Sequence, residues 1–518
     1  MPRLALKTDS SFYRKIAMGA IGVRAVCDDL EPHGHQLVEL ERGSSESKIW
    51  KDVKRKRVRI PDLVCKRCGI RIECRAKTKA ELSMSHSTAD AERAWDYGMV
   101  DKDWIAFPIC QPSEDKIWST GRIKKNASYW HERNWIVWQK IGKINYFTVE
   151  AFRSASPKGS STKGVTEGSE TSITWDALFY KRKGRVEKAL AQGLTVSRNT
   201  DNRSYTWKVK PNQSIQVSPG DLVDKYQILA SEMHVLTESE LACNGSLPEG
   251  HIERLLSSRE RTQRFTGIKL ARLLSSAGYC DTVRDIVADG EEDVYVRLEG
   301  ASYLASTCGE STKTLFEPFL SDPDQQNQLE AVIALGETAT DESVFILGNI
   351  LNDLDQQEFL RSAAAWSLGK IGTEPAQKSL INAFKDVNRD LREEALENIV
   401  VIGSSSLDVL LSGLRENDDD VAAGCAEAIR QCDVMPISIL RELACDLAED
   451  RQGKISSKWI VWLLGHMPVE SLVPAIARLQ DTKPELHYAM SILWSFINSW
   501  ISNNWELGPS PREYITED

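Results

Sequence analysis

The chain has 518 residues, of which 41% are hydrophobic and 27% are charged. This composition is ordinary for a folded globular protein, and the length excludes a single domain. No apolar run is long enough to cross a bilayer, and the first residues lack the apolar core of a signal peptide. The sequence therefore predicts a cytoplasmic protein with no membrane partner.

The net charge of −10 is divided unevenly along the chain. Residues 1–250 carry 41 basic and 31 acidic side chains, whereas residues 251–518 carry 24 basic and 44 acidic ones. The basic half can neutralise phosphates and the acidic half repels them. We therefore expect any nucleic acid to bind the N-terminal half.

The hydrophobic pattern of the first 110 residues predicts a mixture of helices and strands. The predicted elements are a helix over 12–30, strands over 36–41, near 56–64 and near 70–78, a short helix over 88–97 and a strand over 103–110. Ser10 or Ser11 can cap the first helix, and a tight turn at Lys66–Gly69 joins the second and third strands. The order is helix, three strands, helix, strand.

Two carboxylates fall on the second and third of these strands. Asp62 follows Pro61 on one strand, and Glu73 lies on the next, so pairing of the strands would bring both carboxylates together. Alternation places Glu73, Arg75 and Lys77 on one face. The opposite face carries Ile72, Cys74 and Ala76. Paired carboxylates beside cations can hold a hard divalent metal ion and act on a phosphodiester.

With Pro61, Asp62, Glu73 and a cation two places further on, residues 10–110 resemble the PD-(D/E)xK nuclease superfamily. The resemblance implies a restriction-endonuclease-like αβββαβ core that binds magnesium and cleaves DNA or, less often, RNA. Asp62 and Glu73 would then be ligands of Mg²⁺ or Mn²⁺. An additional acid often precedes the motif in this family, and Glu39 and Glu41 are the candidates here.

The chain departs from the family at the third motif position, where lysine is usual and Arg75 stands instead. Arginine keeps the positive charge and could stabilise a reacting phosphate. Its guanidinium does not deprotonate, so it cannot serve as a general base. Lys77 could take the place of that lysine, which makes Asp62, Glu73, Arg75 and Lys77 the predicted catalytic set. Otherwise the domain is an inactive nuclease fold.

A dense basic run surrounds this motif. Residues 51–80 contain twelve basic side chains and three acidic ones. The residues predicted to contact nucleic acid are Lys54, Arg55, Lys56, Arg57, Arg59, Lys66 and Arg67. A solvated, charged hairpin is the alternative interpretation of the same run.

The turn between the motif strands contains two cysteines, Cys65 and Cys68, followed by Gly69. Two thiolates at this spacing can hold one side of a structural zinc ion, and two further ligands are needed. Those ligands could be drawn from His33, His35, His86, Cys74 or Cys110. The alternative is a pair of reduced turn cysteines, because the sequence predicts thiols or metal ligands, not a disulfide framework, for its eleven cysteines.

Residues 113–245 predict an aromatic- and β-rich middle region. The aromatic run over 126–138 could stack nucleic-acid bases or fill a small core. The serine-, glycine- and lysine-rich composition near 154–172 predicts a flexible loop. Alternation of apolar and polar residues predicts a small β module over about 170–235. Its function cannot be read from the sequence.

From about residue 250 the pattern becomes helical and repeats about every thirty residues. Matching segments with small residues at fixed places lie at 299–304, 330–336, 362–369, 394–399 and 424–429. They resemble HEAT repeats, and Arg297, Arg361 and Arg392 occupy similar places. The fold class is therefore multidomain, α/β followed by α, with a nuclease-like domain over 1–112, the middle region over 113–245 and a HEAT α-solenoid over 250–518.

Two functions follow from this organisation. The first is a metal-dependent endonuclease subunit, with DNA as the first candidate substrate, of a prokaryotic defence or repair system, in which the repeats bind a protein or another copy of the chain. The second is an inactive DNA-binding adaptor that assembles partners through its repeats. A zinc-dependent scaffold with no role in nucleic-acid binding is a third hypothesis. The tryptophans of the last sixty residues could cap the array or bind a partner.

Overall fold

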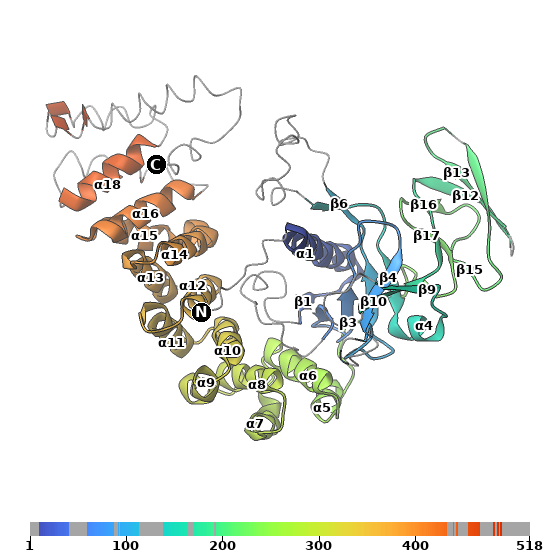
Figure 1. Cartoon of the computed structure of the whole chain (residues 1–518), viewed down its shortest axis with the longest axis horizontal. Coiled ribbons are helices and arrows are strands. Elements are labelled where there is room, and N and C mark those ends of the chain that lie inside the picture. The colour runs from blue at the N-terminus through green and yellow to red at the C-terminus, as the bar shows by residue number, and fades with distance from the viewer. Residues whose placement is uncertain are drawn as a thin grey trace. The chain divides into compact units, whose positions relative to one another are not determined.

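The structure is a computed structural model of the chain (Figure 1). It describes residues 10–40, 60–87, 92, 94–112, 138–162, 170–190, 193–201, 203–432, 439, 442–443, 454–466, 480–481, 484–485 and 487–488. The chain forms two compact units, residues 1–309 and 310–518. The first unit contains the sheets and the first helices of the repeat array, and the second contains the remaining helices.

A five-stranded mixed sheet forms the centre of the first unit. Its strands, in spatial order, are β1 (Leu37–Glu39), β2 (Leu63–Cys65), β3 (Arg71–Cys74), β5 (Trp104–Phe107) and β8 (Asn145–Thr148). All neighbours pair antiparallel except β3 and β5, which are parallel. The antiparallel hairpin of β2 and β3 and its turn at 66–69 are therefore as the sequence predicts.

One face of this sheet packs on helix α1 (Ser10–Leu30) (Figure 1). Leu63 and Ile72 point to this face and join Val26 and Leu30 in a buried core. Burying such side chains contributes roughly 1.5–3 kcal/mol each, so the apolar stripe of α1 fixes which face of the hairpin is covered. The predicted alternation is confirmed, since Ile72 and Cys74 face α1 and Glu73 does not.

The other face is covered by a second, small sheet and a short helix. These elements are β4 (Leu82–Ser87), β9 (Gly159–Thr162), β10 (Glu170–Trp175) and α4 (Val149–Ser154). Phe107, Phe147, Phe152 and Trp175 pack together at this face, with Phe152 and Trp175 ring centres 4.9 Å apart. A two-stranded ribbon of β6 (Cys110–Pro112) and β7 (Trp138–Lys140) extends from the domain.

The predicted β module is present over residues 177–231. It consists of β11 (Ala177–Phe179), β12 (Gly184–Leu190), β13 (Gly193–Arg198), β14 (Ser204–Lys208), β15 (Ser214–Ile215), β16 (Leu222–Val223) and β17 (Ile228–Ser231). The strands form two small sheets around a core that includes Val186, Val196 and Leu229.

Three predictions for the N-terminal half differ from the structure. Residues 94–98 form a bend and turns where the end of a helix over 88–97 was expected. Glu92 is in a 3-10 turn, and residues 88–91 and 93 lie outside the described part. The expected loop near 154–172 includes β9 and the start of β10, because Ser160–Thr162 pair with a neighbouring strand and pairing outweighs composition. The central sheet also extends beyond residue 112, because β8 is one of its strands.

Helices continue from His251 onward, as predicted. In the first unit they are α5 (His251–Leu256), α6 (Arg261–Leu273), α7 (Cys280–Ala288) and α8 (Val294–Thr307). In the second they are α9 (Thr312–Leu320), α10 (Gln325–Thr338), α11 (Asp341–Asn352), α12 (Glu358–Ile371), α13 (Glu374–Asn382), α14 (Arg389–Ile402), α15 (Leu407–Leu414), α16 (Asp419–Gln431) and α18 (Lys454–Gly465). All five predicted repeat segments fall within α8, α10, α12, α14 and α16.

Two kinds of contact recur between helices of the repeat array. A small residue permits close helix crossing: a Cβ on Gly336 of α10 would lie 2.8 Å from the Cβ of Ser367 on α12. The arginine at the repeated place donates to a carbonyl at the end of the preceding helix, from Arg297 Nε to Val287 O at 3.0 Å and from Arg361 Nε to Leu351 O at 2.9 Å. These carbonyls have no partner within their own helix, so the arginines satisfy them.

One helical stretch, Arg389–Leu414, is apolar and long enough to cross a membrane by length and composition alone. It comprises two helices, α14 and α15, separated at Gly403, where φ is +71°. Ala395, Ile399 and Leu410 from these helices are buried in the array. Packing within the repeat array therefore accounts for part of the apolar composition of this stretch, whose apolar 18-residue window is 28% buried.

Candidate functional site

The hairpin of β2 and β3 places Asp62 opposite Glu73. The register of the two strands pairs Leu63 with Ile72 and Val64 with Arg71. One further step along the hairpin pairs Asp62 with Glu73. Residues that are directly opposite share a face, with Cβ atoms about 4.5–5.5 Å apart. The carboxylate Oδ2 of Asp62 accepts a hydrogen bond from the backbone N–H of Cys74 at 2.8 Å, which holds it alongside β3. The two predicted ligands are therefore neighbours.

Of the two cations in the predicted set, Arg75 pairs with Glu73 and Lys77 contacts a neighbouring strand. Arg75 Nη2 is 3.0 Å from Glu73 Oε1, and the same nitrogen is 3.4 Å from the carbonyl of Trp95. Arg75 Nε is buried and has no hydrogen-bond partner among the described residues. Lys77 Nζ donates to Ser83 Oγ on β4 at 3.0 Å. We call Asp62, Glu73, Arg75 and Lys77 the carboxylate face.

Glu39, one candidate for the additional acid, lies on the wrong side of the sheet. It pairs with Leu63, whose side chain packs on α1, so Glu39 also faces α1 and not the carboxylate face. Burial, together with the charges of Asp28 and Glu39, raises the pKa of Cys27 on α1 to about 11. The sequence alone does not give the register of β1. A shift of one residue moves a strand side chain to the other face, which explains why Glu39 was a wrong candidate. Glu41 lies outside the described residues.

Most of the predicted nucleic-acid contacts fall outside the described part of the chain. They are Lys54, Arg55, Lys56, Arg57 and Arg59. Of the two others, Lys66 is half-buried and Arg67 is exposed, with its Nη1 donating to the Gly34 carbonyl at 2.9 Å. The aromatic run over 126–138 is described only at Trp138, which is buried in β7.

Arg71 shows that part of the basic run is structural. It forms a buried pair with Asp103, with Nη2 at 2.5 Å from Oδ2 and Nε at 3.0 Å from Oδ1, and donates to Thr266 Oγ1 of α6 at 3.3 Å. Burial raises the pKa of Asp103, although the charge of Arg71 opposes this shift. Thr262 of α6 also donates to the Gly98 carbonyl at 3.1 Å. The first long array helix is therefore docked on the hairpin, which sequence reasoning missed.

A cluster of sulfur and nitrogen ligands surrounds the turn between β2 and β3. It consists of His35, Cys65, Cys68 and Cys243, whose ligand atoms all lie within 4.8 Å of one another. The Sγ atoms of Cys65 and Cys243 are 4.0 Å apart, and Cys68 Sγ is 3.7 Å from His35 Nδ1. We call these four residues the cysteine–histidine cluster. Among the described residues it is the one group of three or more such ligands close enough to share an ion.

The cluster completes the half-site that the sequence indicates at Cys65 and Cys68. A hydrogen bond between these thiols lowers the pKa of Cys65 and raises that of Cys68. His35 was among the candidate ligands, but Cys243 was missed because it follows Cys65 by 178 residues. The one local signal at this position was the composition of residues 243–245, Cys-Asn-Gly, which is typical of a turn just before the helical array.

The other candidate ligands have different neighbours. His33 pairs with Glu238 at 3.2 Å, and His86 Nδ1 accepts from the backbone N–H of Trp95 at 3.4 Å. Cys74 lies on the face of the sheet that packs on α1, and Cys110 is buried in β6. None of these four belongs to the cysteine–histidine cluster.

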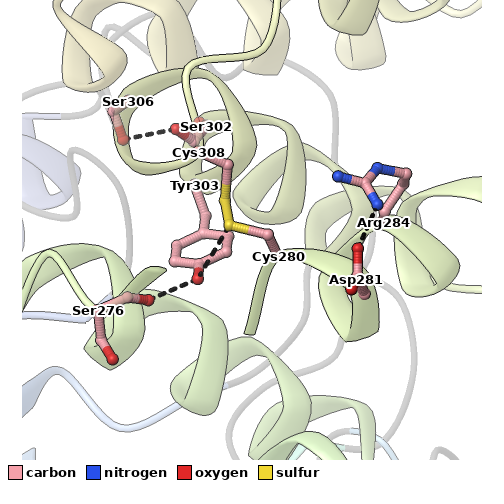
Figure 2. Close-up of a disulfide and its surroundings, with 8 residues drawn as sticks. All are labelled: Ser276, Cys280, Asp281, Arg284, Ser302, Tyr303, Ser306 and Cys308. Atoms are coloured by element: carbon pink, nitrogen blue, oxygen red, sulfur yellow. Dashed lines mark hydrogen bonds and ion pairs between the residues drawn. A yellow bond between two sulfur atoms is a disulfide. The ribbon is translucent and has the colours of Figure 1, made fainter. Parts of the chain in front are cut away.

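Two cysteines of the array form a disulfide, contrary to the prediction of thiols (Figure 2). Cys280 begins α7 and Cys308 follows α8, and packing of these helices brings their Cα atoms to 6.0 Å. The hydroxyl of Tyr303 lies beside Cys280 and donates to the Ser276 carbonyl at 2.5 Å. Disulfides persist mainly in oxidising compartments, so the cytoplasmic location stays a prediction.

Comparison with known proteins identifies the repeats and nothing else in the chain. Residues 312–400 match the family model for HEAT repeats, so α9 to α14 belong to repeats of this family. A search of curated proteins finds no match.

Solved structures with similar helical arrays include three at low identity. Escherichia coli YibA is 17% identical, over 48% of this chain and 93% of its own, with a TM-score of 0.23. Human deoxyhypusine hydroxylase in complex with glycerol is 14% identical, over 44% and 99%, with a TM-score of 0.18. A designed armadillo repeat protein in complex with the peptide (KR)4 is 14% identical, over 47% and 98%, with a TM-score of 0.18. Likeness at this level says nothing about what this chain binds.

Proposed function

We propose that the carboxylate face is a metal-dependent site for hydrolysis of nucleic-acid phosphodiesters, with DNA as the first candidate substrate. The observation that carries the proposal is the pairing that sets Asp62 opposite Glu73 with Arg75 beside them. The parallel pairing of β3 with β5 supports the resemblance to the PD-(D/E)xK superfamily, because αβββαβ order requires a crossover between these strands.

The donor set of the carboxylate face fits the ion that the family uses. Asp62 and Glu73 offer carboxylate oxygens, which are the ligands that Mg²⁺ and Mn²⁺ prefer. Arg75 is held beside the carboxylates by its ion pair with Glu73, so a cation is in place for the phosphate charge. A bound ion would supply Lewis-acid stabilisation of the phosphate and an activated water.

The chain's own residues then have separate roles. Asp62 and Glu73 hold the ion. Arg75 neutralises charge that develops on the phosphate oxygens. Lys77 is held by Ser83 beyond Arg75, where it can contact the next phosphate along the strand. Arg75 cannot remove a proton, because its guanidinium stays protonated. Activation of the attacking water is therefore chemistry that a bound ion would supply, with Asp62 and Glu73 as the residues that would hold the ion.

The ion pair between Glu73 and Arg75 favours a second candidate function. A carboxylate already neutralised by arginine binds a cation less well, and the family lysine is absent at this position. The domain would then be an inactive nuclease fold that binds DNA and serves as an adaptor. Both candidates share the fold, and the metal dependence of cleavage separates them.

The HEAT repeats give the chain a protein-binding part. Stacked repeats present extended surfaces that usually bind proteins, and the excess of acidic side chains after residue 250 suits a basic partner. A nuclease fold joined to such an array is an architecture found in defence and repair effectors of prokaryotes. That placement rests on analogy of architecture alone.

The test compares cleavage and binding of labelled duplex and single-stranded DNA and of RNA by the full chain and by variants. Asp62→Asn and Glu73→Gln should each reduce Mg²⁺- or Mn²⁺-dependent cleavage by at least about a hundredfold without loss of DNA binding. Glu39→Gln is the matched control, because it removes a carboxylate from the opposite face, and it should cleave normally. Arg75→Lys restores the family residue and should retain or increase cleavage.

Two results would decide against the hydrolase. DNA binding without cleavage in the wild type and in Arg75→Lys, with either metal, would favour the adaptor. Cleavage that survives in both Asp62→Asn and Glu73→Gln would place the chemistry elsewhere.

A further inference from the structure

We infer that His35, Cys65, Cys68 and Cys243 form a closed structural zinc site that fastens the segment leading into the helical array to the central sheet. The four residues come from three separate parts of the chain. His35 precedes β1, Cys65 is the last residue of β2, Cys68 lies in the turn that follows β2, and Cys243 precedes α5. Nothing in the proposed hydrolase requires this site.

The spacing of the four ligand atoms matches a tetrahedral zinc ion. With Zn–S bonds near 2.3 Å, two sulfurs of a tetrahedral site lie about 3.8 Å apart. The Cys65–Cys243 separation of 4.0 Å and the Cys68–His35 separation of 3.7 Å are both close to this value. No pair of ligand atoms is more than 4.8 Å apart, so one ion can reach all four.

The orientation of His35 is already that of a metal ligand. Its Nε2 lies 2.9 Å from the carbonyl oxygen of Leu241. A carbonyl only accepts, so Nε2 carries the proton, and the lone pair is left on Nδ1, which points at Cys68. Zinc-bound histidines commonly donate their other N–H in this way, which fixes the tautomer and the ring. Trp104 packs edge-on against the ring, with centres 5.5 Å apart.

The backbone around the cluster is arranged to present the ligands. The N–H of Gly69 donates to Cys65 O at 2.9 Å, and the φ of +77° at Gly69 lets the turn close with both sulfurs on one side. The N–H of Cys243 donates to His33 O at 2.9 Å, which sets Cys243 beside His35. Cys65 is fully buried and His35 is 5% exposed.

The ligand set indicates a structural role. Four protein ligands complete the coordination of zinc and leave no position for water or substrate, as in structural sites and unlike catalytic ones. Leu241, two residues before Cys243, is buried in the core between the sheet and α1. The site would therefore hold residues 241–243 on the sheet immediately before the helices begin.

The competing states of the cluster are a disulfide between Cys65 and Cys243 and a set of free thiols. Sulfurs 4.0 Å apart are not bonded, yet they are close enough to oxidise after a small movement. In both states the Nδ1 lone pair of His35 accepts at most the weak S–H hydrogen bond of Cys68, whereas zinc uses all four ligands. The three states differ in metal content, in mass and in thiol reactivity.

The test begins with the full-length wild type, purified without chelator, and measures zinc by elemental mass spectrometry. We expect about one zinc ion per chain. Exchange with Co²⁺ should give the visible bands of a tetrahedral site with thiolate ligands. Alkylation should spare Cys65, Cys68 and Cys243 until a strong chelator is added, and Cys432, half-buried and outside the cluster, is the internal reference in the same sample.

Variants distinguish loss of a zinc ligand from a general loss of folding. Cys243→Ser should lose the zinc, whereas Cys27→Ser, which removes a half-buried thiol outside the cluster, should retain it. His35→Cys offers a fourth thiolate and should also retain zinc. A wild type with less than about a tenth of an ion per chain that gives no tetrahedral Co²⁺ spectrum would overturn the proposal. So would a peptide map with Cys65 joined to Cys243. None of these readouts measures cleavage, so the zinc site and the hydrolase can fail independently.

Discussion

The repeat array and the central sheet are stabilised in different ways. In the array, the same contact recurs: an arginine satisfies the end of the preceding helix at both Val287 and Leu351, and small residues permit close crossings in successive units. The sheet depends on individual contacts between residues far apart in the chain, such as the buried pair of Arg71 and Asp103. Damage should therefore remain local in the array and spread through the domain in the sheet.

The strongest test of this contrast is Arg71→Met. The change leaves Asp103 buried without its cation, and breaking a buried pair in this way costs about 3–5 kcal/mol. Because Arg71 also contacts Thr266, we expect α6 to exchange amide hydrogens faster together with the sheet. Hydrogen exchange with mass spectrometry measures both. Arg284→Ala is the control, since its partner Asp281 is 96% exposed, and little change is expected. Unchanged exchange in α6 would contradict the docking role.

The disulfide between Cys280 and Cys308 supplies the second test. It closes a loop of 28 residues, and the loss of chain entropy in the unfolded state corresponds to about 3–4 kcal/mol. Cys308→Ser should therefore lower the stability of α7 and α8 by that amount under oxidising conditions. In excess reductant the variant and the wild type should become equal. A difference that persists in reductant would mean that the serine disturbs packing and that the bond is not the cause.

Close helix crossing in the array is tested by Gly336→Ala. The added Cβ would lie 2.8 Å from Ser367 Cβ and 3.1 Å from its Cα, so the helices must separate slightly, at a cost of about 1–3 kcal/mol. Gly278→Ala is a matched control, because nothing lies within 4 Å of its new Cβ. Faster exchange confined to α10 and α12 would support the local character of the array. Exchange that rises equally along all of α9–α16 would contradict it.

The smallest expected effect concerns Glu240, in the turn that precedes Cys243. Hydrogen bonds from the backbone and hydroxyl of Thr237 lower the pKa of Glu240 from 4.5 to about 2. A lowered pKa in the folded state stabilises the fold above pH 4.5, and this contribution is lost as the pH falls toward 2. Because the side chain is 45% exposed, Glu240→Gln should cost no more than about 1 kcal/mol at pH 7.

Comparing the melting of wild type and Glu240→Gln across this pH range cancels effects common to both proteins. The difference between them should shrink steadily from pH 5 to pH 2. A constant difference would show that Glu240 acts through its shape and not through its charge.

The features that the sequence predicted correctly are those set by residues close together in the chain. Helical periodicity located one helix in each of five repeats, α8, α10, α12, α14 and α16, and strand alternation placed Glu73 on the face opposite Ile72. The register of β1 could not be obtained in this way, because residues 40–62 separate it from β2 and a shift of one residue moves Glu39 between faces. Partners far apart in sequence were also missed, as with Arg71 and Thr266, because no local pattern couples them.

The distance along the chain between Cys65 and Cys243 has a consequence for synthesis of the protein. Ribosomes add about 5–20 residues per second, so the 178 residues between these cysteines take roughly 9–36 s to translate. During that interval His35, Cys65 and Cys68 have already emerged while their fourth neighbour does not yet exist. The nascent chain therefore carries a pair of thiols that other thiols, oxidants or metal ions can reach before the native cluster can form.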